Sequence, residues 1–332
     1  MNPTLDIIIV NWNSAQHLRE CLKSIMITNK DGFDLSQVVV VDNASSDSSI
    51  DDLDDLDLPL TLIRNPENIG FAAACNQGAR GSTSDYILFL NPDTQMFTDS
   101  LCKPINYMQQ TENSKIGICG IQLIDGEGHA SHTCARFPTP KLFFSKMLGL
   151  HRLFPKIFST YILDEWDHTD NRAVDHVMGS FYLVRRKIFE SLGGFDERFF
   201  VYLEDLDFSY RAKKYGWSSY YLAEAQIFHK GGGASEKVKA ARLFYSLHSR
   251  IVYVHKHFDW RLATVLTIGT LIFEPIARLV LASARFSSKE MLETLKGYWM
   301  LWGTFPKLLR MAWKRSKYEN SSAQPLRPTG RQ

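Results

Sequence analysis

The chain has 332 residues, of which 45% are hydrophobic and 22% charged, with a formal net charge of +2. These values are ordinary for a globular protein with at least one sizeable core, and they exclude a small disulfide-stapled scaffold. The charge is uneven, because residues 42–57 hold seven aspartates, whereas residues 285–332 hold ten Lys or Arg and only three Glu. The basic end predicts contact with an anionic surface, with a solvated helical face as the alternative.

The cysteines and the termini give further limits. The five cysteines are odd in number and form no C-x-x-C pair, which favours reduced thiols over a disulfide framework or a zinc site. The N-terminus has no basic segment before its apolar run, so no signal peptide is expected. The longest apolar run, residues 262–273, is followed by Glu274 and Pro275. We expect a core helix or an interfacial segment there, because the run is short for a membrane span.

The first elements alternate between strands and helices. A continuous apolar run at residues 5–10 predicts a strand that is buried on both faces. Ser14 is a candidate cap for the following helix, which carries an apolar face of Leu18, Cys21, Leu22 and Ile25. Strands are predicted at residues 37–41, 61–63, 85–90, 116–121 and 177–185. Helices are predicted at residues 69–80 and 205–215, with Gly216 ending the second.

This alternation predicts an α/β fold with a mixed, mostly parallel sheet and flanking helices. We expect one domain over residues 1–235, with an insertion at about residues 125–175. A helical C-terminal extension, which is a candidate for membrane association, is predicted over residues 236–319. A polar, disordered tail is predicted over residues 320–332.

Ligands of such sheets bind outside the carboxyl ends of the strands, where Asn11, Asp42 and Asp93 follow apolar runs. The chain lacks the G-x-G-x-x-G and G-x-x-x-x-G-K-[ST] nucleotide motifs and the G-x-S-x-G esterase motif, which disfavours those enzyme classes. Asp42 fits two interpretations, a carboxylate that reads a pyrimidine base and an Asx-turn. Asn68 and Gly70 open a helix, either as an anion site that allows close backbone approach or as a simple helix start.

Three carboxylates, Glu204, Asp205 and Asp207, interrupt an aromatic and apolar segment. Carboxylates in such a frame point to a metal site or a proton-transfer site. Asp207 lies two residues beyond Asp205 and therefore points elsewhere, so we interpret it as structural. Asp93, mounted at a strand end after Pro92, offers oxygen ligands to a hard divalent cation.

The ordered motifs resemble a known family. VDNASSD at residues 41–47, ENIGFA at 67–72, NPD at 91–93, LEDLDF at 203–208 and FHKGGG at 228–233 occur in this order. The series resembles family 2 glycosyltransferases of the GT-A fold, especially bacterial rhamnosyltransferase-like members, over about residues 5–255. The resemblance implies an inverting transferase that uses a nucleotide-activated sugar together with Mg²⁺ or Mn²⁺.

The same resemblance implies roles for individual residues. Asp42 would read the nucleotide base, and Asp93 and His229 would hold the metal. Asp205 would be the general base on the acceptor hydroxyl, with Glu204 helping to place the acceptor. The metal motif departs from the common Asp-x-Asp form, because its first position is Asn91.

The remaining candidates fall on two sides of the site. On the donor side we place Asn11, Asn68, Gly70, Asn91 and Arg250. On the acceptor side we place Gly179, Ser180 and Arg136. For Gly179 and Ser180 a plain strand is an equal alternative, and for Arg136 and Arg250 an ordinary surface arginine is the simpler interpretation.

The C-terminal segment at residues 305–317 has Leu308 and Leu309 on one helical face, and the other face is basic, with Lys307, Arg310, Lys314 and Lys317. A basic amphipathic helix of this kind can lie in a membrane interface, with a packed helix as the alternative. The expected partners are a dTDP- or UDP-sugar donor and a lipid-linked glycan acceptor at the cytoplasmic face of the cell membrane, and no nucleic acid. The rival functions are a non-catalytic glycan-binding subunit and a nucleotidyltransferase.

Overall fold

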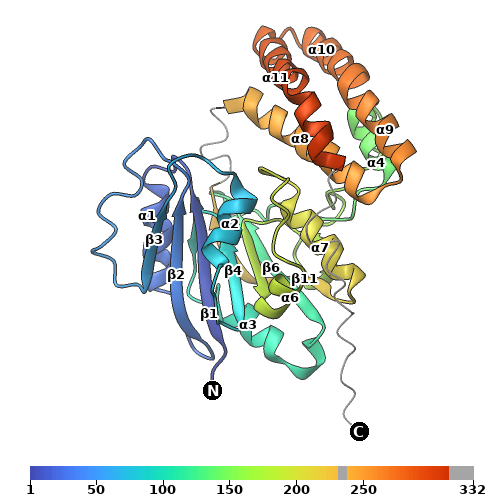
Figure 1. Ribbon diagram of the computed structural model, residues 1–332. Coiled ribbons are helices and arrows are strands. Elements are labelled where there is room, and N and C mark those ends of the chain that lie inside the picture. Colours follow the sequence, from blue (N-terminus) through green and yellow to red (C-terminus); the bar gives the residue numbers. More distant parts are fainter. Residues whose placement is uncertain (231–237, 314–332) are drawn as a thin grey trace.

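The computed structural model describes residues 1–230 and 238–313, and Figure 1 shows a sheet domain with a helical module at one side. The predicted tail at residues 320–332 and the glycine cluster at 231–233 lie outside the described residues. So do Lys314 and Lys317, which were assigned to the basic helical face.

The main sheet has nine strands in the order β3-β2-β1-β4-β10-β6-β11-β5, with β8 paired to β11, and β7 and β9 form a second, two-stranded sheet. The strands are β1 (Thr4–Asn11), β2 (Asp34–Asp42), β3 (Leu60–Arg64), β4 (Tyr86–Leu90), β5 (Thr94–Met96), β6 (Ile116–Ile124), β7 (Cys134–Ala135), β8 (Arg172–Val174), β9 (His176–Val177), β10 (Phe181–Arg185) and β11 (Ser218–His229).

The predicted fold class is confirmed. Strands β1 to β4 pair in parallel, and so do β6 and β11, whereas β10 runs antiparallel between β4 and β6. The sheet is therefore mixed and mostly parallel. The parallel strands β1, β2 and β4 end at one edge, which brings the polar residues after them together.

The helices are α1 (His17–Met26), α2 (Phe71–Ala79), α3 (Cys102–Gln109), α4 (Pro140–Met147), α5 (Leu150–Leu153), α6 (Arg186–Ser191), α7 (Glu204–Lys214), α8 (Lys239–His257), α9 (Trp260–Ile268), α10 (Glu274–Ala284) and α11 (Ser288–Trp313). Short 3₁₀ and π-helical turns lie at Thr111–Asn113 and Gly269–Phe273.

The sheet is covered on both faces, as continuous apolar strands require. Ile7 and Ile9 of β1 pack into one core with α1 and α3, and the alternate residues Ile8 and Val10 pack into a second core with α2 and α7. The predicted apolar face of α1 is buried, and the five cysteines are free and buried, as expected. Ser14 is not the helix cap, because α1 begins after Gln16 and the Ser14 hydroxyl donates to Asn11 instead.

Two strand predictions need correction. The predicted strand at residues 177–185 is two strands, β9 and β10, separated by Met178, Gly179 and Ser180. The twelve-residue strand β11 went unpredicted, because polar residues such as Glu224 and Gln226 interrupt its apolar residues.

A third core joins the C-terminal helices to the insertion and to α7. Phe143 of α4, Leu247 of α8 and Leu301 of α11 belong to it, together with Phe199 and Leu206 beside the start of α7. The predicted insertion thus contributes α4 as a helical support for the module formed by α8 to α11. Within the predicted basic helix, Leu308 is buried and Lys307 and Arg310 are exposed.

The apolar run at residues 262–273 belongs to a longer helix than the sequence indicated. Trp260–Ala284 is helical throughout its 25 residues, and an 18-residue stretch within it has a mean hydropathy of 1.8. The helix is therefore long and apolar enough to cross a membrane by length and composition alone. The π-helical turn precedes Pro275, which lies in the first turn of α10, where its missing N–H is tolerated. Glu274 does not break the helix, because Arg250 and Arg278 pair with its carboxylate.

Candidate active site

Asn11 is a buried support for Asp42. The two residues lie opposite each other in the β1–β2 register, and the Asn11 amide donates to the Asp42 carboxylate at 2.8 Å and to the hydroxyls of Ser45 and Ser49. The other Asp42 oxygen accepts the Ser45 backbone N–H at 3.2 Å. This is the turn arrangement that the sequence left open as an alternative. Because Asn11 is fully buried, it acts through Asp42 rather than by reaching a ligand.

Gly70 makes its close approach to protein rather than to open space. Its φ is +90°, and a Cβ there would lie 2.7 Å from the backbone oxygen of Phe200. The first free N–H of α2, that of Phe71, donates to the same oxygen, and the Asn68 side chain accepts the Gly70 N–H. The N-terminus of α2 therefore holds the loop before α7, which replaces the predicted anion site.

Asp93 and His229 are brought together by sheet pairing. Strand β5 pairs with the end of β11, so that His229 lies opposite Thr94. The His229 Nε2 is 3.4 Å from Asp93 Oδ1, and both side chains remain partly exposed, at 19% and 14%. Burial alone would raise the pKa of the Asp93 carboxyl. The hydrogen bond and charge of His229 outweigh this effect, so the pKa of Asp93 lies below its ordinary value. The pair offers one oxygen and one nitrogen ligand side by side.

Two basic groups near Asp93 were not identified from the sequence. The Lys230 N–H donates to the Asp93 backbone oxygen, and the Lys230 ammonium lies 3.3 Å from His17 Nε2. His17 begins α1, and its charge also lowers the pKa of Asp93. Their convergence depends on the β5–β11 pairing. Together with His229 they form a basic rim suited to an anionic ligand.

Gly179 and Ser180 connect the strand ends to the acidic helix. Because β10 pairs with β4, the backbone N–H of Asn91 donates to the backbone oxygen of Ser180. The Asn91 side-chain amide also donates to the Ser180 hydroxyl, at 3.3 Å. The preceding residue, Gly179, donates its N–H to Asp205 Oδ2 at 2.8 Å. The candidate donor residue Asn91 and the candidate base Asp205 are therefore linked through two consecutive residues.

A buried polar chain supports Asp205. His176 Nε2 lies 3.6 Å from Asp205 Oδ2, and His176 Nδ1 lies 3.0 Å from the Ser209 hydroxyl, which contacts Tyr182. Burial lowers the pKa of His176, although the nearby aspartates oppose the shift, so the ring is neutral near pH 7. A lone histidine in an apolar strand carries no sequence signal for this role, which depends on β9 packing against α7.

Glu204 is more deeply buried than its neighbour Asp205. Its carboxyl is buried, and one oxygen has no hydrogen-bond partner within the described part of the chain. Burial, and then the charge of Asp205, raise the pKa of Glu204 well above its ordinary value. This raised pKa favours the protonated form of Glu204, and a protonated carboxyl can donate one hydrogen bond.

The loop that leads into α7 is strained. Tyr202 and Leu203 both have positive φ, at 69° and 66°, and neither is glycine. Such conformations cost about 1–3 kcal/mol each and cluster at functional sites. The strain turns Glu204 and Asp205 into the first turn of α7, where the helix dipole stabilises an anion.

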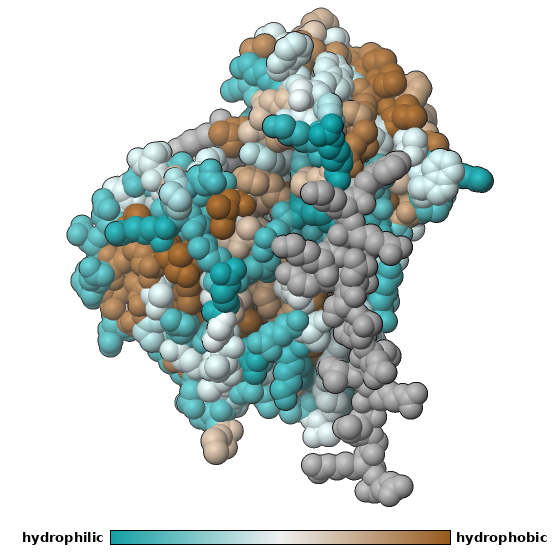
Figure 2. All heavy atoms as spheres, viewed as in Figure 1, coloured by the Kyte–Doolittle hydropathy of each residue, from teal (hydrophilic) through white to brown (hydrophobic). Residues whose placement is uncertain are grey.

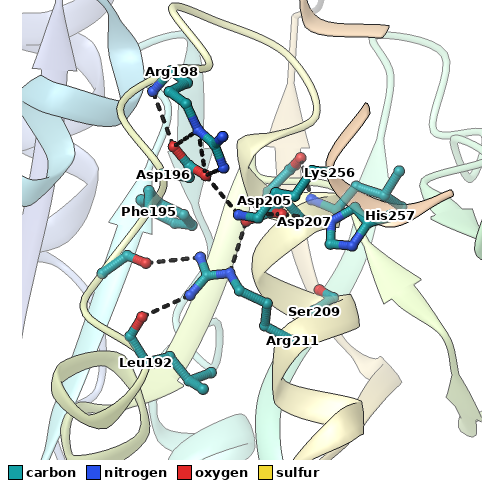
Figure 3. A network of polar contacts seen from close by, with 12 residues as sticks. Leu192, Phe195, Asp196, Arg198, Asp205, Asp207, Ser209, Arg211, Lys256 and His257 are labelled. Carbon is teal, nitrogen blue, oxygen red and sulfur yellow. Dashed lines mark hydrogen bonds and ion pairs between the residues drawn. The ribbon is translucent and has the colours of Figure 1, made fainter. Parts of the chain in front are cut away.

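Asp207 is surrounded by basic residues, as Figure 3 shows. Its carboxylate is fully buried and pairs with Arg211 at 2.8 Å, Lys256 at 2.8 Å and His257 at 2.7 Å. Burial would raise the pKa of Asp207, but these partners hold it well below the ordinary value. Lys256 also pairs with Asp196, so the cluster joins α7, α8 and the loop before α7. This structural arrangement agrees with the interpretation of Asp207 from the sequence.

Two predicted contact residues lie in other networks. Arg250 is buried in α8 and pairs with Glu274, so a structural ion pair takes the place of the predicted donor contact. The Arg136 guanidinium pairs with Glu165 and donates to the backbone oxygen of Thr160, both in the insertion. The structure therefore does not bring these two arginines to Asp93 or Asp205.

The site offers few ready-made metal ligands. Within residues 1–230 and 238–313, no group of three or more His, Cys, Asp or Glu side chains is arranged to hold a metal ion. Asp93 and His229 fit a divalent cation that takes its remaining ligands from water and from an anionic substrate. The amide of Asn91, held against Ser180, adds no formal charge there.

Comparisons with known proteins identify similar sequences and a similar fold. Residues 6–193 match the family model described as glycosyl transferase family 2. An N-acetylglucosaminyl-diphospho-decaprenol L-rhamnosyltransferase of Mycobacterium tuberculosis is 25% identical over 279 residues, which are 78% of this chain and 87% of the relative. The dTDP-rhamnosyl transferase RfbF of Shigella flexneri is 26% identical, over 90% of this chain and 96% of its own.

A solved structure shares the fold. The mannosyltransferase PcManGT from Pyrobaculum calidifontis, in complex with GDP-Man and Mn²⁺, has a TM-score of 0.51 and 18% sequence identity. The match covers 94% of this chain and 86% of that chain. At this identity the likeness establishes the fold alone.

Proposed function

The chain belongs to glycosyl transferase family 2 and is a glycosyltransferase, and from this premise we propose that its donor is dTDP-L-rhamnose and its acceptor a lipid-linked cell-surface glycan. The donor proposal is supported by the rhamnosyl transferases among the relatives, one of which is named for dTDP-rhamnose. The acceptor proposal is supported by the relative whose name includes a diphospho-decaprenol. We place the reaction at the cytoplasmic face of the cell membrane, with inversion at the sugar.

The observation that carries the proposal is the link through Gly179 and Ser180. It sets Asn91, at the strand ends, beside Asp205, at the start of α7. A sugar nucleotide at the strand ends would thus present its anomeric carbon toward a carboxylate on the other side. Inverting transfer requires this arrangement, with leaving group and base on opposite faces of the sugar.

The proposed step uses Asp205 as the base. The acceptor oxygen forms a bond to the anomeric carbon, the bond from that carbon to the diphosphate oxygen breaks, and the hydroxyl proton moves to Asp205. The Asp205 side chain is 16% exposed, which leaves it accessible to a hydroxyl. General-base catalysis of this kind contributes about 10²–10⁴ in rate. Glu204, whose raised pKa favours the protonated form, is suited to hold the acceptor through a hydrogen bond.

Asp93 and His229 would hold Mg²⁺ or Mn²⁺ beside the donor diphosphate. A bound divalent cation supplies charge neutralisation for a departing diphosphate. His17 and Lys230 add positive charge on the same rim, so part of the diphosphate binding depends on the protein itself. Asp42, fixed by Asn11, is the candidate contact for the pyrimidine base.

The test is a donor panel with the purified full-length protein and MnCl₂. We expect slow release of dTDP from dTDP-L-rhamnose, and faster release when a detergent-solubilised polyprenyl-diphosphate glycan is added. Asp93→Ala is expected to weaken metal-dependent dTDP binding by about tenfold or more, measured by calorimetry. The matched control is Asp99→Ala, at an exposed aspartate paired with Lys103. Release from UDP-sugars alone would overturn the donor proposal, and no release from any donor would favour a non-catalytic subunit.

A further inference from the structure

The long helix Trp260–Ala284 exposes one apolar face. Val265, Ile268, Ile272, Ile276 and Val280 are all between 45% and 62% exposed, and they recur every three or four residues. Trp302 of α11 extends this face, because its indole N–H donates to the Leu271 backbone oxygen and the ring is 45% exposed. We call these six residues the apolar face. Figure 2 shows hydrophobic residues gathered over α9 and α10.

The opposite side of the same helix packs against the protein through apolar residues and one charged residue, Glu274. Ala263 and Leu266 pack into the third core, and the Glu274 carboxylate is buried against Arg250 of α8 and Arg278. This helix therefore buries one apolar side together with Glu274 and leaves a second apolar side exposed, unlike an ordinary surface helix, whose outer side is polar. A contiguous apolar surface of this kind marks an interaction site.

From this arrangement we infer that the apolar face inserts into the headgroup and acyl boundary of an anionic lipid bilayer. The charge around the face supports this occupant. Residues 259–313 carry seven Lys or Arg against four Asp or Glu, and one of those acids is the buried and neutralised Glu274. Anionic lipids attract basic surfaces of this kind electrostatically. Trp260, which begins the helix and is 71% exposed, and Trp302 are suited to the interface level.

The helix lies on the membrane rather than crossing it. Its inner face is fixed to α8 by the Glu274–Arg250 ion pair, and α8 is fixed to α7 by the Asp207 cluster. Leaving this position for a span would separate Glu274 from Arg250 and place a charge in hydrocarbon. The membrane contact predicted at residues 305–317 thus moves to α9 and α10, with the exposed Lys307 and Arg310 of α11 as accessory charges.

The inference deepens the proposed function, because a lipid-linked acceptor requires an active site held near the bilayer. The helical module provides that link. Helix α8 pairs with Glu274, on the buried side of the helix that bears the apolar face, and with Asp207, two residues from the candidate base. Lipid binding and sugar transfer are nevertheless measured separately, so either can fail alone.

The experiment is vesicle flotation of the full-length protein without donor or acceptor. The vesicles are phosphatidylcholine alone or phosphatidylcholine with one third phosphatidylglycerol. We expect flotation with the anionic vesicles and much less with the neutral ones. The double variant Ile272→Glu/Ile276→Glu is expected to lower the fraction bound by about tenfold or more. The matched control is Ile27→Glu, at an isoleucine 69% exposed at the end of α1, where flotation should be unchanged.

Three outcomes would overturn the inference. They are absence of wild-type flotation, equal flotation of the double variant and wild type, and a wild-type dimer in solution that the double variant breaks. The last would make a second copy the occupant of the face. Transfer to a detergent-solubilised acceptor, assayed without vesicles, should survive in the double variant, which also shows that the variant is folded. If that transfer fails in the wild type while flotation persists, the proposed function falls and the lipid surface stands.

Discussion

Asp205 and Asp207 lie two residues apart on α7, yet their surroundings differ in kind. Asp207 is fully buried among Arg211, Lys256 and His257, so its charge is neutralised by cations from two helices. Asp205 accepts a backbone N–H from Gly179, has the neutral His176 as its neighbour and remains partly exposed. A carboxylate saturated with cations stabilises the fold, whereas one held by neutral donors and open on one side can accept a proton.

The largest expected effect follows from removing the open carboxylate. Asp205→Asn should lower transfer by about 10²–10⁴-fold, because the amide cannot accept the hydroxyl proton. Affinity for dTDP with Mn²⁺ should stay within about twofold, because Asp93 and His229 are unchanged. Radiolabel transfer and calorimetry measure the two quantities. A comparable loss of dTDP affinity would contradict the separation of base and donor roles.

Removing the saturated carboxylate should act on stability instead. Asp207→Asn should lower the free energy of unfolding by about 3–5 kcal/mol, because it leaves Lys256 and His257 buried beside a neutral group. Urea denaturation followed by circular dichroism measures this loss. The control Asp99→Asn removes an exposed pair with Lys103 and should change stability by no more than about 1 kcal/mol. Equal losses in the two variants would remove the distinction between the two kinds of site.

The structural role of Asp207 could be predicted from its spacing on α7, but its partners could not. Lys256 and His257 belong to α8, and only the docking of the C-terminal helices brings them to α7. The parallel strands were predictable from their continuous apolar runs, because burial on both faces leaves a strong pattern. Strand β11 was not, because its exposed polar residues hide the apolar ones.

For the candidate residues at the strand ends, too, the sequence identifies single residues but not their contacts. Asp93 was identifiable from the turn after β4, and His229 from a motif, yet their proximity follows from the β5–β11 pairing. Arg250 was assigned to the donor because sequence alone does not reveal its partner, Glu274, on a later helix. His176 carried no signal, because its role depends on a contact between β9 and α7.

Two histidines of α8, one with an acidic partner and one without, lead to a prediction for the pH dependence of stability. His257 pairs with Asp207, whereas His248 has a buried Nδ1 without a hydrogen-bond partner within the described chain, and burial lowers the pKa of His248 to about 4. The unfolded chain, with a pKa near 6.5, therefore binds a proton that the folded chain rejects. The contribution of neutral His248 to the free energy of unfolding is therefore fully present above about pH 6.5 and is lost as the pH falls toward 4.

The measurement is urea denaturation at pH 7 and pH 5. Between these values the wild type should lose about 1–2 kcal/mol through His248, and His248→Leu should lose that much less. His151, His168, His176, His255 and His257, whose pKa values burial also lowers, contribute to the remaining slope in both proteins. An identical slope in wild type and variant would show that His248 is not the group responsible.

The smallest expected effect follows from a small displacement of the Asp205 carboxylate. A Cβ at Gly179 would lie 3.0 Å from Asp205 Oδ2, and the glycine has no positive φ, so Gly179→Ala displaces the carboxylate without backbone strain. Transfer should fall by about fivefold with stability nearly unchanged, because the carboxylate shifts by only a few tenths of an ångström. The control Gly126→Ala adds a methyl group with nothing within 4 Å and should leave transfer unchanged. A large loss of stability in Gly179→Ala, measured by urea denaturation, would instead make Gly179 a packing residue.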